Sequence, residues 1–359
     1  MMVMPENTPV IGKTQIRLLE RLCNAVAVSG DEAEVRAIVL EEIRPHTDDI
    51  KIDALGNVLA IRHGQSRHRL RVMLAAHMDE VGFMLTANDG EGLFRFETIG
   101  SMDVRQLVGK RVWVGREHIP GVIGARPIHL TTSEDSIREI PLEALRIDIG
   151  TENEIVKPGE RAAFATRFTR LGPSLRAKAL DDRLGVATLA ELVRHAPPNI
   201  DLLAAFTTQE EIGHRGAIVA AYALNPDLAI VIDSTPAFDI PSHDGSENTS
   251  YNTRLGKGPA LYIADSGTLS DPRLVRFLME TAGMNKIPFQ LRQPGGGGTD
   301  AAAIQQARTG IPSISVSVPG RYAHTAMGLC RLEDWKNTLK LLHAALWRIT
   351  PALLGKERR

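Results

Sequence analysis

Short apolar runs separated by amphipathic segments constrain the fold of this chain most strongly. Leu70–Ala76, Leu202–Phe206 and Leu228–Ile232 are almost entirely apolar, as expected for strands that are covered on both faces. Between them, apolar residues recur at helical spacing. This alternation predicts an α/β fold with a mixed sheet in a three-layer core.

The spacing also predicts the position of each further element. Ser313–Val318 is expected to be another strand, and Ile50–Ile61 a hairpin or bent edge strand around Gly56-Asn57. A second helix is expected from Asp31 onward. The other predicted helices are Lys13–Val28, Asp182–His195, Arg215–Leu224, Pro272–Ala282, Thr299–Ala307 and Leu332–Ile349.

Between about Leu85 and Thr169 the pattern changes. Short β-like pieces alternate with Gly, Pro and Asp turns, and no strong helical period is present. This pattern of short strands and turns is typical of a small all-β module inserted into an α/β domain. We therefore expect a discontinuous catalytic domain, residues 1–84 and 171–359, and an inserted, barrel-like β domain at residues 85–170.

Composition narrows the choice of partners and compartment. The formal net charge is −1, so no global field attracts nucleic acid or an anionic membrane. Cys23 and Cys330 are the only cysteines, which fits a reducing compartment. Met1–Thr8 lacks the features of a signal peptide, and no segment approaches eighteen consecutive apolar residues. A cytoplasmic protein without a membrane segment is expected.

Metal-binding residue types follow the ends of predicted core strands or lie at the start of a helix. In open α/β sheets, ligands bind in the crevice outside the carboxyl ends of the strands. Imidazole and carboxylate groups suit zinc, cobalt or manganese. The candidate ligands are His77 in AAHMDEVGF, Asp181 in KALDDRLG, Glu211 in TTQEEIGH, Asp233 in VIDST and His324 in RYAHTAMG. Together they predict a site for two divalent ions.

Other residues near these ligands suggest supporting roles. Because Glu210 and Glu211 are adjacent in a loop, one can bind metal while the other stays free as a base. Asp79 follows His77 by two residues, close enough to orient its ring. His214 is expected to support the loop rather than to bind metal. Taken singly, each candidate ligand has a more common structural role, such as a helix N-cap for Asp181. Their joint occurrence argues for the metal site.

Eight stretches resemble one family in order along the chain. They are AVSGDEAEVR, AAHMDEVGFM, GVIGARPIHL, IDIGTENE, KALDDRLGVA, TTQEEIGHRGA, GGGTDAAAI and RYAHT, and they run from about residue 27 to 325. The chain is similar to the tetrahedral aminopeptidases, the glutamyl-aminopeptidase-like dinuclear metallopeptidases that are sometimes labelled endoglucanases. The resemblance implies that His77 and Asp233 hold one metal ion and that Glu211 and His324 hold the other.

The same resemblance assigns the remaining roles. Asp181, rather than Asp182, would bridge two divalent ions, with zinc expected and cobalt or manganese as alternatives. Glu210 would be the general base and acid for attack by a metal-bridged hydroxide, and Asp79 would orient His77. The substrates would be peptides that lose N-terminal residues. The inserted domain would mediate dimerisation, and dimers in this family commonly assemble into tetrahedral dodecamers.

Two alternatives remain open. A glycoside hydrolase would need two carboxylates flanking a sugar, no metal dependence, and a groove lined with aromatic side chains. Aromatic residues make up only 4% of this chain, which argues weakly against that activity. A catalytically silent relative would have lost a ligand or the base, whereas all five ligands and Glu210 are present.

Overall fold

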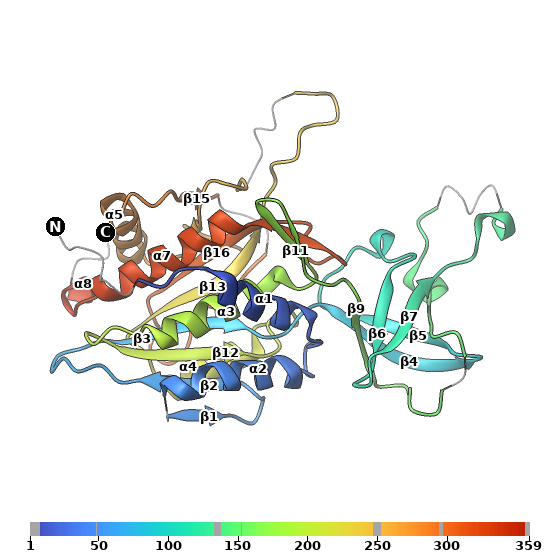
Figure 1. Ribbon diagram of the computed structural model, residues 1–359, viewed down its shortest axis with the longest axis horizontal. Coiled ribbons are helices and arrows are strands. Elements are labelled where there is room, and N and C mark those ends of the chain that lie inside the picture. Colours follow the sequence, from blue (N-terminus) through green and yellow to red (C-terminus); the bar gives the residue numbers. More distant parts are fainter. Residues whose placement is uncertain are drawn as a thin grey trace.

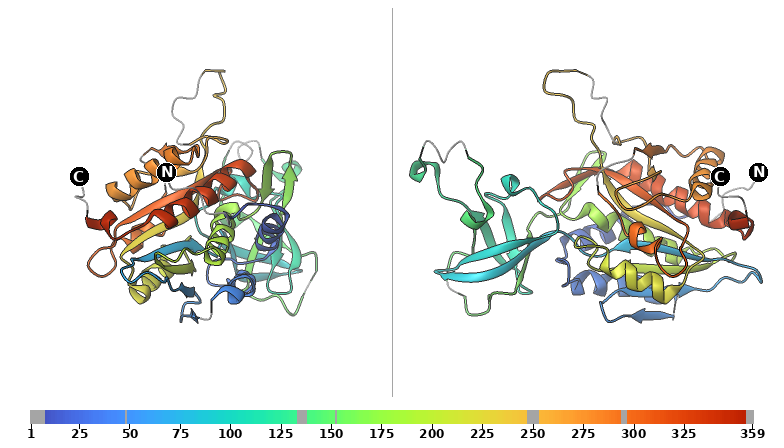
Figure 2. Two further views of the ribbon diagram at one scale, coloured as in Figure 1. Left: turned by 60° about the vertical axis from the view of Figure 1, so that its left-hand side comes forward. Right: turned by 180° about the vertical axis from the view of Figure 1, so that it is seen from behind.

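The computed structural model describes residues 8–47, 49–132, 138–151, 153–246, 253–293 and 297–355. The chain forms a large mixed sheet covered by helices and a separate closed barrel (Figure 1). Seen from behind, the barrel stands beyond one end of the helix-covered sheet (Figure 2). The expected α/β core with a small inserted β domain is confirmed. Among the described residues, no helix combines the length and apolar character needed to cross a membrane.

The large sheet has 11 strands, and its centre is parallel. In the order β2-β12-β3-β13-β16, strand β12 pairs in parallel with β3, β3 with β13, and β13 with β16. The strands are β1 (Ile50–Ile52), β2 (Val58–Arg62), β3 (Arg71–His77), β10 (Thr169–Leu171), β11 (Ser174–Ala177), β12 (Asp201–Thr207), β13 (Leu228–Pro236), β14 (Ala260–Tyr262), β15 (Gln290–Arg292), β16 (Ser313–Arg321) and β17 (Gly328–Arg331). The hairpin expected at Ile50–Ile61 is the antiparallel pair β1–β2.

Alternation along β3 explains the three layers. Val72, Leu74 and Ala76 belong to one apolar core, whereas Met73 and Ala75 belong to a second on the opposite face. The first core lies under α1 (Lys13–Asn24), α2 (Ala33–Ile43), α3 (Leu180–Arg194), α5 (Pro272–Met284), α7 (Leu332–Arg348) and α8 (Ala352–Gly355). The second core lies under α4 (Arg215–Leu224) and α6 (Ala301–Ile304). Burial on both faces is why these strands read as continuous apolar runs.

The barrel closes in the order β4-β5-β8-β7-β6-β9, with antiparallel neighbours. Its core contains Phe83, which packs edge-to-face against Phe96 and Phe164 with ring centroids 5.2 Å apart in each pair. The strands are β4 (Gly82–Gly90), β5 (Leu93–Ile99), β6 (Arg111–Val114), β7 (Ile119–Gly124), β8 (Arg146–Asp148) and β9 (Arg161–Phe164).

Two helices are shorter than the sequence predicts. Helix α1 ends at Asn24 rather than Val28, because the backbone N–H groups of Val26 and Ala27 donate to the carboxylates of Glu34 and Glu80. Helix α6 covers only Ala301–Ile304 of the expected Thr299–Ala307. There the amide of Ile311 donates back to the carbonyl of Gln305, which turns the chain into β16. Met1–Asn7 lie outside the described residues.

Candidate metal centre

The parallel strands bring the predicted ligands to one edge of the sheet. His77 is the last residue of β3, and in the pairing of β12 with β3 it lies opposite Thr207, the last residue of β12. Glu210 and Glu211 follow in the loop after β12, and Asp233 lies near the end of β13. Because parallel strands end at the same edge, residues far apart in sequence meet there.

Asp181 and His324 complete the group from irregular backbone. Asp181 lies at the start of α3 with non-helical dihedral angles, and its peptide bond to Asp182 is cis. His324 follows β16 with a φ of 57°, in the left-handed region. Its Nδ1 lies 2.9 Å from the carbonyl oxygen of Ser101, which follows barrel strand β5. The barrel thus helps to hold this histidine at the edge of the sheet.

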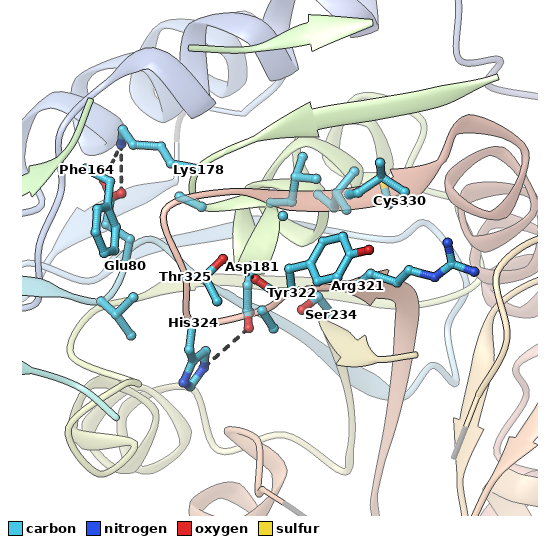
Figure 3. A pocket seen from close by; sticks show the side chains of 18 of the residues that line it. Glu80, Phe164, Lys178, Asp181, Ser234, Arg321, Tyr322, His324, Thr325 and Cys330 are labelled. Atoms are coloured by element: carbon cyan, nitrogen blue, oxygen red, sulfur yellow. Dashed lines mark hydrogen bonds and ion pairs between the residues drawn. The ribbon is translucent and has the colours of Figure 1, made fainter. Parts of the chain in front are cut away.

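The ligands form two groups that share one carboxylate. In the first, His77 Nε2 lies 3.3 Å from Asp181 Oδ1 and 3.8 Å from Asp233 Oδ1. In the second, His324 Nε2 lies 3.6 Å from Asp181 Oδ2 and 3.3 Å from Glu211 Oε2 (the His324–Asp181 pair is drawn in Figure 3). Within each group the candidate donor atoms all lie within 4.8 Å of one another. Each oxygen of Asp181 therefore faces a different group.

Buried charges strongly perturb the pKa values at this edge. Burial alone lowers the pKa of His77, but the carboxylates of Asp181, Asp233 and Asp79 outweigh it and hold that pKa well above its usual value. Burial raises the pKa of Glu211 well above the ordinary value, and nearby Asp181 adds to the effect. Concentrated carboxylates in a dry site repel one another unless cations neutralise them.

Asp79 contacts more than the histidine that it was expected to orient. Its Oδ1 faces His77 Nδ1 at 3.5 Å. Its two oxygens also accept hydrogen bonds from the backbone N–H groups of Glu210 at 3.0 Å and Glu211 at 3.2 Å, and from Ser29 Oγ at 2.6 Å. The fully buried carboxylate of Asp79 therefore ties the end of β3 to the loop that carries both glutamates.

Glu210 lies at the same edge but in neither ligand group. Its Oε1 is 3.1 Å from Nε2 of His214, which begins helix α4 as its N-cap. Burial raises the pKa of Glu210 well above its ordinary value, His77 opposes this increase, and Asp233 adds to it. His214 likewise belongs to neither group and contacts the glutamate on its own loop.

Sequence reasoning missed a buried charged network beneath the centre. Lys178 Nζ lies 2.6 and 2.8 Å from the two carboxylate oxygens of Glu80 and 2.6 Å from the carbonyl oxygen of Ala25 (Figure 3). Arg183 donates to Glu80 Oε1 at 3.1 Å, to the carbonyl of Asp79 at 3.0 Å and to the carbonyl of Met78. Arg183 and Glu80 stood within the quoted motifs, but only three-dimensional proximity reveals their pairing.

Two aspartates near the centre take no part in either ligand group. Asp182 Oδ1 accepts a hydrogen bond from the backbone N–H of Gly185 at 2.9 Å, as at the first turn of a helix. A Cβ on Gly185 would lie 2.2 Å from Asp182 Oδ2, so this close approach requires glycine. Asp300, just before α6, accepts a hydrogen bond from the Thr207 hydroxyl at 2.5 Å.

The donor set fits two divalent ions. Each group offers one imidazole nitrogen and two carboxylates, and the groups meet at Asp181. These donor types suit zinc, cobalt or manganese. Beside the shared carboxylate a narrow cavity of about 30 Å³ is lined by residues that include Asp181, Glu211, Tyr322, His324 and Thr325 (Figure 3). A cavity needs about 10–15 Å³ of such volume to hold one water molecule, so this cavity has room for one.

Comparisons with known proteins identify relatives that are named aminopeptidases. A putative aminopeptidase from Acetivibrio thermocellus is 34% identical over 92% of this chain and 97% of its own length. The crystal structure of a TET aminopeptidase from Thaumarchaeota archaeon SCGC AB-539-E09 has a TM-score of 0.89 and 32% identity, covering 95% of this chain and 98% of its own.

A second solved structure and a family profile extend the comparison. The TET1 peptidase of Pyrococcus horikoshii, described as assembling into a tetrahedron or a large octahedral shell, has a TM-score of 0.81 and 32% identity, covering 93% of this chain and 100% of its own. The profile of the M42 glutamyl aminopeptidases matches residues 56–341, which is most of the sequence. The chain therefore belongs to the M42 glutamyl aminopeptidase family.

Proposed function

We propose that this protein is a dinuclear, metal-dependent aminopeptidase that removes N-terminal residues from peptides. The observation that carries the proposal is the pair of histidine–carboxylate groups joined through Asp181. Membership of an aminopeptidase family supports the reaction class. The closely spaced and largely enclosed carboxylates support the requirement for divalent cations.

The ligand roles follow from the two groups. His77 and Asp233 would hold one ion, Glu211 and His324 would hold the other, and Asp181 would serve both. Zinc is the proposed metal, with cobalt and manganese as the alternatives that the same donors accept. A bound pair of such ions supplies a Lewis acid and lowers the pKa of a water molecule.

Glu210 is the proposed general base and acid. Its carboxylate lies beside the ligand groups without joining them, so it is free to take a proton from the attacking water. It then returns that proton to the departing amine. Asp79 fixes both ends of this arrangement, because it faces the His77 ring and holds the backbone of Glu210 and Glu211.

The two alternative functions make different demands. A glycoside hydrolase needs a pair of carboxylates free to flank a sugar. Here every carboxylate of the proposed ligand-and-base set lies 3.1–3.8 Å from an imidazole nitrogen of His77, His214 or His324. A silent relative would lack a ligand or the base. The presence of every proposed group therefore favours the peptidase.

The barrel, whose strands run from Gly82 to Phe164, is the proposed dimerisation domain, inserted between the two segments of the catalytic domain. Ile128 and Leu130, which are 74% and 69% exposed on one turn of that domain, support a surface that self-association would cover. The assembly described for the Pyrococcus horikoshii peptidase supports a further step from dimers to a tetrahedral dodecamer.

Hydrolysis of unblocked aminoacyl-anilides tests this function. Chelator-stripped protein is assayed alone and after addition of zinc, cobalt or manganese. We expect activity only with metal, and none on the N-acetylated forms of the same substrates. Metal-loaded, folded protein that cleaves none of the anilides would overturn the proposal, and polysaccharide hydrolysis without metal would establish the glycosidase instead.

A further inference from the structure

A second, larger cavity adjoins the proposed active site. It measures about 390 Å³, within the range of small-molecule pockets, and lies between the barrel and the loop that carries His324. Its lining includes Lys110 and Arg111 from the barrel, and Tyr322 and Thr325 from the loop that carries His324. Tyr322 and Thr325 also line the narrow cavity beside Asp181, so the two cavities adjoin at these residues (both side chains are labelled in Figure 3).

The barrel wall of this cavity is positively charged. In β6, Val112 and Val114 point into the apolar core of the barrel, so Arg111 lies on its outer surface. Lys110 precedes it in the same wall. Among the described residues, no hydrogen-bond or ion-pair partner is found for either side chain. No Asp or Glu lines the cavity within the described part of the chain.

Lys110 and Arg111 lie outside the proposed metal centre, so we assign them no role in metal binding. None of the proposed metal ligands, nor Glu210, lines the larger cavity. A peptide whose first peptide bond lies at Asp181 keeps its N-terminal residue beside the ligand groups. Its remaining residues extend away from the ligand groups, and the adjoining cavity past Tyr322 and Thr325 offers them space.

We propose that this cavity is a subsite for a carboxylate on the leaving part of the peptide, with Lys110 and Arg111 as its cationic partners. The inference rests on the proposed aminopeptidase function and names a substrate class for it: peptides with a negative charge just beyond the cleaved bond. Guanidinium and ammonium groups both pair with carboxylates, and a guanidinium can do so through two hydrogen bonds.

Two sources can present this carboxylate: the C-terminus of a dipeptide or tripeptide, and an acidic side chain on the second residue. The first source makes short peptides preferred substrates. The second makes the preference depend on sequence and not on length. Amidated peptides separate the two sources, because amidation removes the terminal charge and leaves the side chain unchanged.

The test measures kcat/KM for leucine release from matched peptides by the zinc-loaded enzyme. Leu-Ala is compared with Leu-Ala-amide, and Leu-Glu-amide with Leu-Gln-amide. The double variant Lys110→Gln/Arg111→Gln is compared with Arg126→Gln/Lys157→Gln, which removes the same charge from exposed sites on the same domain outside the cavity. Leu-anilide, which has no carboxylate, reports the basal activity.

We expect the cavity variant to lose about tenfold in kcat/KM on the carboxylate-bearing peptides, because two partly exposed ion pairs are lost. Its activity on Leu-Ala-amide and Leu-anilide is expected to change less than twofold, and the Arg126/Lys157 control less than twofold on every substrate. A loss confined to Leu-Ala assigns the terminal carboxylate as the source, and a loss confined to Leu-Glu-amide assigns the side chain.

Equal activity of wild type and cavity variant on every carboxylate-bearing peptide overturns the subsite. So does an equal loss on charged and uncharged substrates. Both results leave the aminopeptidase proposal intact, because Leu-anilide is still cleaved. If wild-type protein cleaves neither Leu-anilide nor any peptide with any of the metals, the proposed function itself fails, and the subsite fails with it.

Discussion

Replacing Glu210 with glutamine separates metal binding from proton transfer. The amide has nearly the same shape as the carboxylate, and Glu210 belongs to neither ligand group, so both metal positions are preserved. The backbone N–H of residue 210 still donates to Asp79, which keeps the loop in place. The variant loses only the ability to accept a proton from the attacking water.

The expected loss follows from that one function. A positioned general base contributes about 10²–10⁴-fold in rate, or about 2.7–5.4 kcal/mol of activation free energy. We therefore expect kcat for an aminoacyl-anilide to fall at least a hundredfold, while elemental analysis still finds two metal ions per subunit. Glu97→Gln, which removes an exposed carboxylate on β5, serves as the control and is expected to retain full activity.

A contrasting variant identifies the ligand. Glu211→Gln alters the neighbouring glutamate, whose Oε2 lies 3.3 Å from His324 Nε2, and is expected to lower the metal content as well as the rate. If Glu210→Gln retains more than a tenth of wild-type activity, or loses metal as Glu211→Gln does, the assignment of Glu210 as the base is refuted.

Three further predictions concern residues outside the proposed ligand set. Asp79→Asn should lower metal affinity or activity about 10- to 100-fold, because it weakens the contact that orients His77; unchanged metal titrations and kinetics would contradict this. Arg183→Met should destabilise the fold by about 3 kcal/mol or more in urea unfolding, since it breaks a buried ionic network; a change below 1 kcal/mol would refute it. Burial and then His195 lower the pKa of His343 to about 4, so between pH 6.5 and 4 the unfolded chain binds a proton that the folded chain does not. Stability should therefore fall as pH is lowered through this window, and the fall should be smaller in His343→Gln; equal slopes in urea unfolding would count against it.

The sequence predicted where the site lies because strand ends are local features. Apolar runs marked β3 and β13, and parallel pairing then placed His77 and Asp233 at one edge of the sheet. The inserted β domain was similarly visible from its turns and short strands. The strand pairing that closes the barrel was harder to predict from the sequence, because β4 pairs with β9, from which most of the domain separates it along the chain.

Details that depend on long-range contacts could not be derived from residue spacing, although the family resemblance did assign Asp181 a bridging role. The two oxygens of Asp181 face different histidines from a non-helical segment at the start of α3, which lies between the end of β3 and the loop after β16. The contacts of Asp79 with the loop after β12, and of Arg183 with the end of β3, join distant segments through single side chains. Sequence spacing contains no information about such pairings.

Anomalous diffraction from zinc-loaded crystals would locate the metal ions without relying on activity. We expect two zinc peaks per subunit, about 3.5–4 Å apart, with the carboxylate of Asp181 between them. His77 and Asp233 should bind one ion, and Glu211 and His324 the other. A single peak at this edge of the sheet, or two peaks that do not share Asp181, would contradict the dinuclear centre.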